Sequence, residues 1–467
     1  MATTRRQFLG SAAAATSVLA HGAVGDGIKD DTDALQRAID EGGMLTIEPG
    51  TYRLTRPLVM DTAQRGYGGV RGAEGTSRLL MAAPGPAIRV VGDHRGTANP
   101  NRVEAHTWEE ERFPCLTGFE VVGAHPEADG IELELTMQAT VCAVLIRECR
   151  HGIHLITRNR NVIIADCHIY NGGDSGVFLD GCNLHQINIL GNHISYCKRG
   201  GIRQFNGDVH NVQITGNDIE YNSGFDGLSG EILLEIPDDG MISEYTIASN
   251  TIQATPDAPG ANIVVAGRGE PDKPQVGSMA ISGNIIGSRD KNILIDTAFR
   301  AITISGNVIY SGIASNLHFR NCRSVLAGTN TIVPLRRMSY GTSGQCGIVL
   351  EDCWECSLNG NIINDHEAGD EERGGAVSIV RSHGITVSTN QIANPRFRGV
   401  WLEDSQRCTI TTNTVSETRD AKTLVAAIEA AGENTGHVIQ HNIVAKGSKG
   451  AVSCDPAAGS LAGNTET

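Results

Sequence analysis

Seven ionisable side chains that could act on a sugar lie between residues 154 and 235. One is an imidazole, two are cations and four are carboxylates: His154, Lys198, Arg203, Asp180, Asp226, Glu231 and Glu235. In β-elimination on a uronate polymer, a cation neutralises the sugar carboxylate and a base removes the adjacent proton. The sequence favours this reaction because Lys198, Arg199 and Arg203 gather positive charge on an acidic chain. Arg203 is the residue expected to neutralise or deprotonate the uronate.

The carboxylates leave other chemistries open. In glycoside hydrolysis or glycosyl transfer, two carboxylates flank the reacting bond, and Asp226 with Glu231 or Glu235 would form that pair. Asp180 and Glu235 could instead hold Ca²⁺, which prefers oxygen ligands, and no other cofactor is expected. A third hypothesis involves no reaction: a carbohydrate-binding surface protein would use the same side chains to hold its ligand.

Alternation along β-strands predicts which side chains share a face. Each strand of interest begins with Gly and an apolar residue, and we take the apolar residue as inward and the next as outward. Two outward rows result, the first being His154, Phe178, Arg203, His318, Val349, Ser378 and Trp401. The second is Ile156, Asp180, Phe205, Asp296, Arg320, Glu351, Val380 and Glu403. Stacking faces and directional polar groups suit a sugar chain, so substrate binding is expected at Phe178, Asp180, Phe205, His318 and Trp401.

A repeat of about 25 residues supplies the frame for these rows. Short Gly-Asn segments such as those at Asn192, Asn217, Asn284 and Asn307 recur, each with an apolar residue two positions later, and the series continues through Asn330, Asn361, Asn390, Asn413 and Asn442. Cys142 and Cys167 fill the same slot upstream, which predicts that they are neighbours in one internal column. Units of this length with short β segments indicate coils of a parallel β-helix, stacked about 4.8 Å apart. The asparagines are expected to form a ladder of side-chain hydrogen bonds.

Long turns between the strands are expected to build walls around a site on this scaffold. The candidate insertions are 93–112, which holds His94, Arg95, His106 and Trp108, together with 223–240, 336–340 and 365–373. The segment 223–240 is expected to wall the site between His154 and Glu235. Should that site prove inactive, His366 and Glu367 are the next place to look.

The segment from Gly22 to Asp40 predicts a tight turn followed by an amphipathic helix. Asp31 or Thr32 is expected to cap this helix, and Leu35, Ala38 and Ile39 share one face. The run Gly-Ala-Val-Gly-Asp-Gly-Ile-Lys-Asp-Asp-Thr from Gly22 resembles the N-terminal segment of the pectate-lyase-like β-helix superfamily. The resemblance implies an all-β chain, a single right-handed parallel β-helix with an N-terminal capping helix.

The same resemblance implies a polysaccharide or oligosaccharide as the partner. The resemblance does not indicate which reaction is catalysed, because lyases, hydrolases, epimerases and phage spikes share the fold. The set of catalytic residues typical of polygalacturonases is absent from the sequence. Ser382-His383-Gly384 is the segment that comes nearest to one of its motifs, and the likeness is weak. The best expectation is a polysaccharide lyase, with a hydrolase or glycosyl-transferring enzyme and a binding protein as alternatives.

Composition agrees with a turn-rich β protein that works outside the cytoplasm. The 467 residues include 56 Gly and only 20 Phe, Trp and Tyr, and the formal charge is −15, which argues against a nucleic-acid partner. Thr4-Arg5-Arg6-Gln7-Phe8-Leu9-Gly10, followed by an Ala-rich stretch to Ala20, resembles a twin-arginine export signal. A periplasmic or extracellular location is therefore expected. No other stretch approaches the roughly 20 apolar residues of a membrane span.

These observations divide the chain into four expected segments. They are the signal at 1–20, the turn and capping helix at 21–45, the β-helix at 46–455 and a C-terminal tail at 456–467. Cys353 and Cys356 form a single C-x-x-C without a second pair, so we interpret them as buried small residues and expect no metal there.

Overall fold

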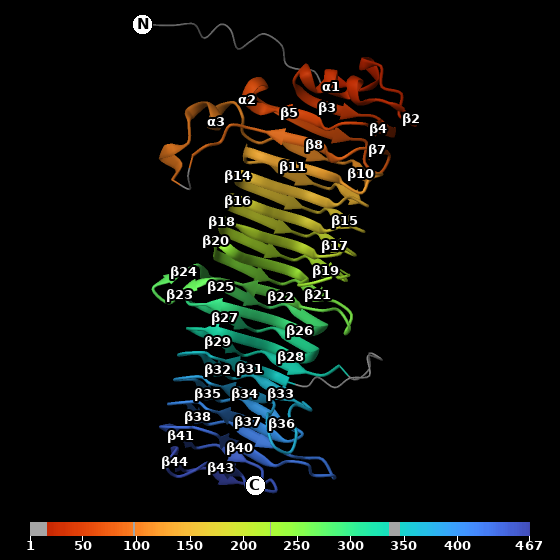
Figure 1. Cartoon of the computed structure of the whole chain (residues 1–467). Coiled ribbons are helices and arrows are strands. Elements are labelled where there is room, and N and C mark those ends of the chain that lie inside the picture. Colours follow the sequence, from red (N-terminus) through yellow and green to blue (C-terminus); the bar gives the residue numbers. More distant parts are fainter. Residues whose placement is uncertain (1–15, 97–98, 225, 336–345) are drawn as a thin grey trace. The chain divides into compact units, whose positions relative to one another are not determined.

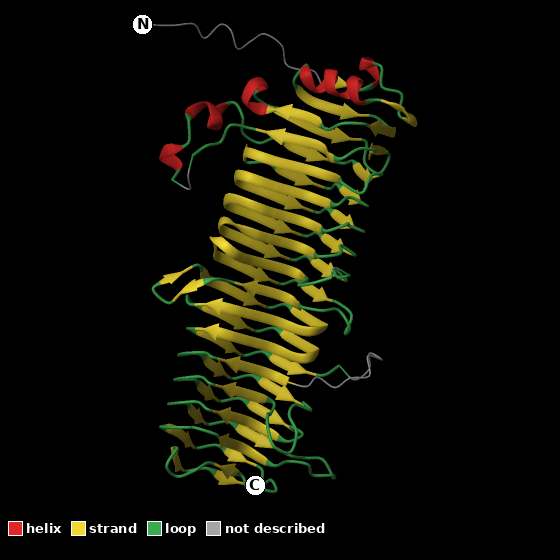
Figure 2. Cartoon of the chain, in the orientation of Figure 1, coloured by secondary structure: helices red, strands yellow, loops and turns green. Residues whose placement is uncertain are grey.

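The computed structural model describes residues 16–96, 99–224, 226–335 and 346–467. These residues form two compact units, the first ending at Ser195 and the second beginning at Tyr196. Strands dominate both units, and the helices of the described residues all lie in the first (Figure 2). Within each unit the strands pair in parallel with the next coil along three faces (Figure 1). The parallel β-helix expected from the repeat is therefore confirmed in both units.

The first face carries the two outward rows. In unit 1 it contains β5 (Leu58–Asp61), β8 (Gly85–Val91), β11 (Ala128–Met137) and the first halves of β14 (His151–Ala165) and β16 (Ser175–Leu190). In unit 2 it contains the first halves of β18 (Gly200–Thr215) and β20 (Gly230–Ala248), then β22 (Ala261–Ala266), the second halves of β26 (Ile285–Ala298) and β28 (Val308–Cys322), β31 (Cys346–Glu351), β34 (Val377–Val380), β37 (Arg398–Glu403), β40 (Ala426–Ala431) and β43 (Val452–Ser453).

The other two faces complete each coil. The second contains β1 (Thr16–Ser17), β3 (Gly43–Ile47), β6 (Gly68–Gly72), β9 (Cys115–Thr117) and β12 (Thr140–Cys142) in unit 1, and β25 (Val276–Ser282), β27 (Ile302–Ser305), β29 (Val325–Gly328), β32 (Ser357–Asn359), β35 (Thr386–Ser388), β38 (Thr409–Thr411), β41 (His437–Gln440) and β44 (Gly459–Ala462) in unit 2. The third contains β2 (Asp26–Asp30), β4 (Gly50–Leu54), β7 (Ser77–Met81), β10 (Glu120–Gly123), β13 (Leu145–Arg147), β15 (His168–Tyr170) and β17 (His193–Ser195), and then β19 (Asp218–Glu220), β21 (Thr251–Gln253), β30 (Thr331–Val333), β33 (Ile362–Asn364), β36 (Gln391–Ala393), β39 (Thr414–Ser416), β42 (Ile443–Val444) and β45 (Thr465–Glu466). A hairpin of β23 (Gly269–Glu270) and β24 (Lys273–Pro274) stands apart from them.

Buried aliphatic columns hold the coils together. The inward residues of the first face in unit 2 are completely buried, namely Ile202, Ile232, Ile263, Ile293, Leu317, Ile348, Val377, Val400 and Ile428. Each is one position from an outward residue, as strand alternation requires. Burying a side chain of this size contributes roughly 1.5–3 kcal/mol, so these columns fix the register that places the outward side chains.

The N-terminal segment packs as predicted, with one difference. Helix α1 (Thr32–Asp40) buries Leu35, Ala38 and Ile39 and contacts β1, β3, β4 and β5. Asp31 stands at the N-cap, but its carboxylate accepts hydrogen bonds from the N–H groups of Val24 and Gly25 instead of from the helix. The reason is that the preceding tight turn also leaves N–H groups without partners, and it lies within reach of Asp31.

Strand pairing extends beyond the expected boundaries of the β-helix. At the C-terminal end, β44 and β45 pair with β41 and β42 within the segment expected to be a tail. At the other end β1 pairs with β3, and Val18 is fully buried. The Arg5-Arg6 pair of the expected export signal lies outside the described residues, as does the insertion 336–340.

The asparagine ladder is confirmed in unit 2. Each side-chain oxygen accepts the backbone N–H of the preceding ladder residue, and each amide group donates to a neighbouring coil, from Asn217 through Asn250, Asn284, Asn307, Asn330, Asn361, Asn390, Asn413 and Asn442 to Asn464. In unit 1, Asn192 bonds in the same way to the N–H of Cys167 and the carbonyl of Ile164.

The ladder predicts a large cost for removing one amide. Asn307 accepts from the backbone and side chain of Asn284 and donates to Asn330 and the carbonyl of Ile281. Asn307→Ala is expected to lower the free energy of unfolding by about 3 kcal/mol, because buried donors and acceptors left unpaired cost about 1–3 kcal/mol each. Urea titration measures the loss. Asn359→Ala is the control, since Asn359 is exposed and should cost within about 0.5 kcal/mol; equal effects of the two changes would contradict a structural ladder.

The expected pairing of Cys142 with Cys167 is wrong by two residues. Leu145 pairs with His168, so Val144 and not Cys142 precedes Cys167 in its column, while Cys142 pairs with Ala165. The 25-residue step overestimates this coil because the strands on both sides of the turn pair at an offset of 23 residues, Cys142 with Ala165 and Leu145 with His168. Cys353 and Cys356 are buried free thiols, as predicted, and their Sγ atoms donate to the carbonyls of Phe319 and Cys322.

Candidate active site

Strand pairing places three ionisable residues around His318 on the first face of unit 2. His318 lies on β28 between Leu294 of β26 and Val349 of β31. Two residues further along each strand, Asp296, Arg320 and Glu351 occupy consecutive positions. The inward neighbours of His318, Leu317 and Phe319, are completely buried, and they hold the imidazole on the outer side of the sheet.

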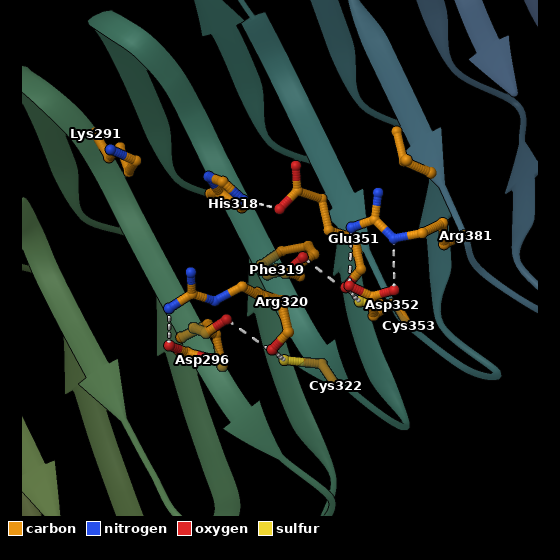
Figure 3. Close-up of polar contacts among 12 residues, drawn as sticks. Lys291, Asp296, His318, Phe319, Arg320, Cys322, Glu351, Asp352, Cys353 and Arg381 are labelled. Carbon is orange, nitrogen blue, oxygen red and sulfur yellow. Dashed lines mark hydrogen bonds and ion pairs between the residues drawn. The ribbon is translucent and has the colours of Figure 1, made fainter. Parts of the chain in front are cut away.

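Direct contacts join these side chains across the strands (Figure 3). His318 Nε2 lies 3.4 Å from Glu351 Oε2, and Arg320 forms an ion pair with Asp296. Lys291, at the start of the same stretch of β26, lies 2.5 Å from Asp290. The next coil adds Arg381, whose guanidinium bonds both oxygens of Asp352 at 2.9 Å. An imidazole, several carboxylates and several cations therefore share one patch.

Burial and nearby cations favour the neutral form of the His318 imidazole. Burial lowers the pKa of His318, Glu351 opposes this change, and the positive charges of Lys291 and Arg320 reinforce it. The side chain retains 18% of its exposure, so the ring is still open to a ligand. A neutral imidazole can accept a proton, and adjacent cations can stabilise a negative charge that develops on a substrate.

A second ionisable cluster lies on the first face of unit 1. His154 Nε2 is 3.1 Å from Asp180 Oδ2, and its Nδ1 is 3.7 Å from Glu132 Oε2. Phe178 stacks on the His154 ring with 5.2 Å between ring centroids. Burial raises the pKa of Glu132, against the opposite effect of Arg89, which lies 3.0 Å away. Phe178 is only 5% exposed, so it supports the imidazole and does not offer an open face to a sugar.

His151 packs against this cluster and predicts a pH dependence of stability. Its ring centroid lies 4.9 Å from those of His154 and Phe178, and burial lowers its pKa to about 4. The unfolded chain, with a histidine pKa near 6.5, binds a proton that the folded chain does not bind between pH 6.5 and 4. Stability should therefore fall as the pH is lowered through this window, by about 2–3 kcal/mol from this residue.

Denaturant titrations of the wild type and of His151→Gln at pH 7 and pH 4.5 measure this contribution. The variant should lose less stability on acidification than the wild type. His168→Gln, at an exposed histidine, should keep the wild-type dependence. The same acid sensitivity in the wild type and in His151→Gln would contradict the assignment.

Arg203 lies in a cluster of side chains in unit 2 that contains three of the predicted residues. Its Nε is 3.3 Å from Glu235 Oε2, and its guanidinium lies 5.0 Å from the centre of the Phe205 ring. Arg199 is 4.0 Å from the same Glu235. The Arg203 side chain is only 5% exposed, so its removal would cost stability as well as any contact with a substrate. Lys198 is exposed on the preceding turn.

Glu231 does not belong to the outward face. It occupies the position held in the preceding coil by Gly201, where an added Cβ would lie 2.6 Å from the interior residue Ile219. Its carboxylate is completely buried and lies 2.9 Å from Arg289. Asp226 is exposed in the loop. The predicted pairing of Asp226 with Glu231 is therefore wrong, because the residue that opens each strand points inward.

Trp401 is likewise covered. It is 3% exposed, donates from Nε1 to Glu403 at 3.1 Å, and has the Arg398 guanidinium 4.7 Å above its ring. It lies in the predicted row but cannot serve as an open stacking face in this conformation. Between Arg203 and His318 the same row contains Leu233, Val264 and Leu294, of which Leu233 and Val264 are completely buried. The first outward row is therefore not continuously polar, because apolar residues separate the patch at Arg203 from the patch at His318.

Two residues of these patches were missed by the sequence analysis. Glu132 follows Gly130-Ile131 just as His154 follows Gly152-Ile153, so the same alternation rule extended by one coil would have found it. Lys291 belongs to a coil in which Asn292, and not glycine, precedes the inward residue Ile293. Only the pairing of Lys291 with Ser315 of β28 places it beside the patch.

Known proteins share this architecture. The sequence profile of the family described as "right handed beta helix region" matches residues 120–253 and 291–465. Pre-mature gene product 12 of bacteriophage phi29 is 15% identical, with a TM-score of 0.57 over 90% of this chain and 54% of the phage chain. The A-module of a mannuronan C-5 epimerase from Azotobacter vinelandii is 14% identical, with a TM-score of 0.42 over 87% of this chain and 96% of that module.

Curated sequences give no further comparison, because none matches the chain significantly. Among the described residues, no helix has both the length and the apolar character needed to cross a membrane. At these identities the solved structures establish the fold alone, and the right-handed winding agrees with the expectation from the sequence.

Proposed function

Because the chain belongs to the right-handed β-helix family, whose members present rows of side chains on rigid parallel sheets, we propose that it is an exported enzyme acting on a polysaccharide. The reaction that the geometry supports best is β-elimination on a uronate-containing glycan. The site is the patch formed by His318, Lys291, Arg320 and Glu351 on the first face of unit 2. Export rests on the twin-arginine pattern at Arg5 and Arg6.

The observation that carries this proposal is the neutral imidazole of His318 among cations. When Nε2–H donates to Glu351, the lone pair remains on Nδ1, where it can take the proton from C5 of the uronate. The C5–H electrons then form the C4–C5 double bond, and the C4–O bond breaks. The leaving oxygen takes up a proton. Lys291 and Arg320 would neutralise the sugar carboxylate while negative charge develops on it.

A specific observation in unit 1 favours glycoside hydrolysis as the second candidate. Burial raises the pKa of Glu132, so this carboxyl group can keep a proton to donate to a leaving sugar oxygen. Asp180, whose side chain is 42% exposed, could activate water from the other side of His154. A pair of one protonated and one ionised carboxyl group is what this reaction requires.

Incubating the protein with a panel of uronate-containing and neutral glycans tests the proposal. A lyase produces unsaturated sugars, which absorb in the ultraviolet, and each cleavage also creates one reducing end. Reducing ends without this absorbance would overturn elimination in favour of hydrolysis. Binding without either product, measured by affinity electrophoresis on the same glycans, would indicate a carbohydrate-binding surface and would contradict an enzyme.

A further inference from the structure

A compact cluster of potential metal ligands lies outside both patches, in the long insertion after β8. Asp93, His106 and Glu111 form this cluster, which we name the Asp93 cluster. His106 belongs to helix α3 (Ala105–Glu109), and Figure 1 shows the segment carrying α3 at the side of unit 1 next to β8. From the sequence, this insertion is expected only to form a wall around a site.

One imidazole nitrogen in the cluster faces three carboxylate oxygens. His106 Nε2 lies 3.0 Å from each oxygen of Asp93 and 3.1 Å from Glu111 Oε1. A single ring nitrogen carries either one proton or one lone pair, so it cannot satisfy three oxygens. In a tetrahedral site, two ligands bonded to one ion at about 2.0–2.2 Å lie roughly 3.3–3.6 Å apart. The 3.0 and 3.1 Å found between these atoms would therefore widen by only a few tenths of an ångström on binding.

Glu111 is the independent sign that this cluster binds a ligand. Its side chain is only 2% exposed, and Oε1 has no hydrogen bond of acceptable geometry among the described residues. The other oxygen, Oε2, accepts the backbone N–H of Asp93 at 2.8 Å. One oxygen is therefore used to fix the carboxylate at the base of the insertion, while the other points at Asp93 and His106. A buried carboxylate oxygen that lacks a well-aligned hydrogen bond is costly.

The backbone around the cluster is anchored to the β-helix. His94 N–H donates to the carbonyl of Leu135 at 2.9 Å, and Phe113 N–H donates to that of Met137 at 3.0 Å. Arg158 Nη1 donates to the carbonyl of Gly96 at 2.6 Å. Both ends of the insertion thus attach to neighbouring coils, so the cluster has a rigid base and does not depend on a free loop.

We propose that Asp93, His106 and Glu111 bind one divalent transition-metal ion of the Zn²⁺ class. A nitrogen ligand favours Zn²⁺ over Ca²⁺ and Mg²⁺, which prefer oxygen ligands alone. The two carboxylates balance the charge of the ion, and three protein ligands leave a position for water. The ion joins residues at the start, middle and end of the insertion and so clamps it onto unit 1.

Co²⁺, a spectroscopic substitute for Zn²⁺, tests the site in the full-length protein without a histidine tag and after chelator treatment. One equivalent of Co²⁺ should produce visible d–d bands without a thiolate charge-transfer band, and one equivalent of Zn²⁺ should displace it. His106→Gln should weaken binding by more than the 10–100-fold typical of losing an outer-shell partner. Because His106 is partly exposed, this change should leave the circular dichroism unchanged; Glu111→Gln should also weaken binding.

The matched control is His210→Gln. His210 also bonds an aspartate, with 2.7 Å between Nε2 and Asp208 Oδ1, but among the described residues it belongs to no group of three potential metal ligands. This variant should bind Co²⁺ like the wild type. The proposal is overturned if the wild type and His106→Gln bind equally, if the spectrum shows thiolate ligands, or if no stoichiometric ion binds. In the last case, His106 is a protonated imidazole shared by two carboxylates.

Discussion

His318→Gln is expected to lower the rate of β-elimination by about 10²–10⁴-fold, the usual contribution of a general base. Glutamine preserves the approximate size and polarity of the side chain but cannot accept the C5 proton. The fold should remain, because the inward residues Leu317 and Phe319 on either side are unchanged and completely buried. Initial rates of ultraviolet absorbance on the best uronate glycan, with circular dichroism of each variant, measure the effect.

His154→Gln is the matched control for this prediction, since His154 is also an outward imidazole bonded to a carboxylate. It should leave elimination close to the wild-type rate. The opposite result, a silent His318→Gln together with inactive His154→Gln and Glu132→Gln, would move the reaction to unit 1 and favour hydrolysis. Loss of activity in neither set would place the active site elsewhere on the chain.

The neighbours of His318 should shift the pH profile in opposite directions. A base acts only when it is unprotonated, so the acid limb of kcat/KM follows its pKa in the free enzyme. Glu351 raises the pKa of His318, and Lys291 lowers it. Glu351→Gln should therefore move the acid limb to lower pH, and Lys291→Met should move it to higher pH. Residues that only supported the fold would leave the limb in place.

Arg289→Met is expected to lower the free energy of unfolding by about 3–5 kcal/mol, because it leaves the Glu231 carboxylate buried without its charged partner. The pair is completely buried, with 2.9 Å between Arg289 Nη1 and Glu231 Oε1. Arg289 also donates to Ser229 Oγ at 2.7 Å and to the carbonyl of Pro259 at 2.8 Å. Urea titration followed by circular dichroism measures the loss.

The stability of Arg289→Met should depend on pH in a direction that can be predicted. Burial raises the pKa of Glu231, and removing Arg289 raises it further. The folded chain then binds a proton at pH values where the unfolded chain, with a glutamate pKa near 4.3, has lost it. Stability of Arg289→Met should therefore fall as the pH rises from about 5 to 8, relative to the wild type. Arg381→Gln breaks the exposed pair with Asp352 and should cost at most about 1 kcal/mol; a similarly small cost for Arg289→Met would rule out a structural role for the buried pair.

The sequence by itself determined the fold, because the information for it is local and repeated. Strand alternation, recurrent turns and the asparagine series depend on residues within one coil, and each coil provides the same evidence again. For this reason the ladder through Asn284, Asn307 and Asn330 and the buried face of α1 agree with the prediction. The same alternation placed His318, Arg320 and Glu351 on the outer face of their strands.

The tertiary structure alone decided which side chains meet. Coils differ in length, so a coil shorter than the 25-residue step moves a residue to another column, as it does for Cys142. A one-residue shift turns a side chain to the opposite face. Glu231 shows the consequence most clearly. Its partner Arg289 is 58 residues away in the sequence. In other coils a glycine occupies the position of Glu231, whereas in this coil the position carries a buried carboxylate. The partners of an ionisable group depend on how coils of unequal length stack, and no pattern within one coil contains that information.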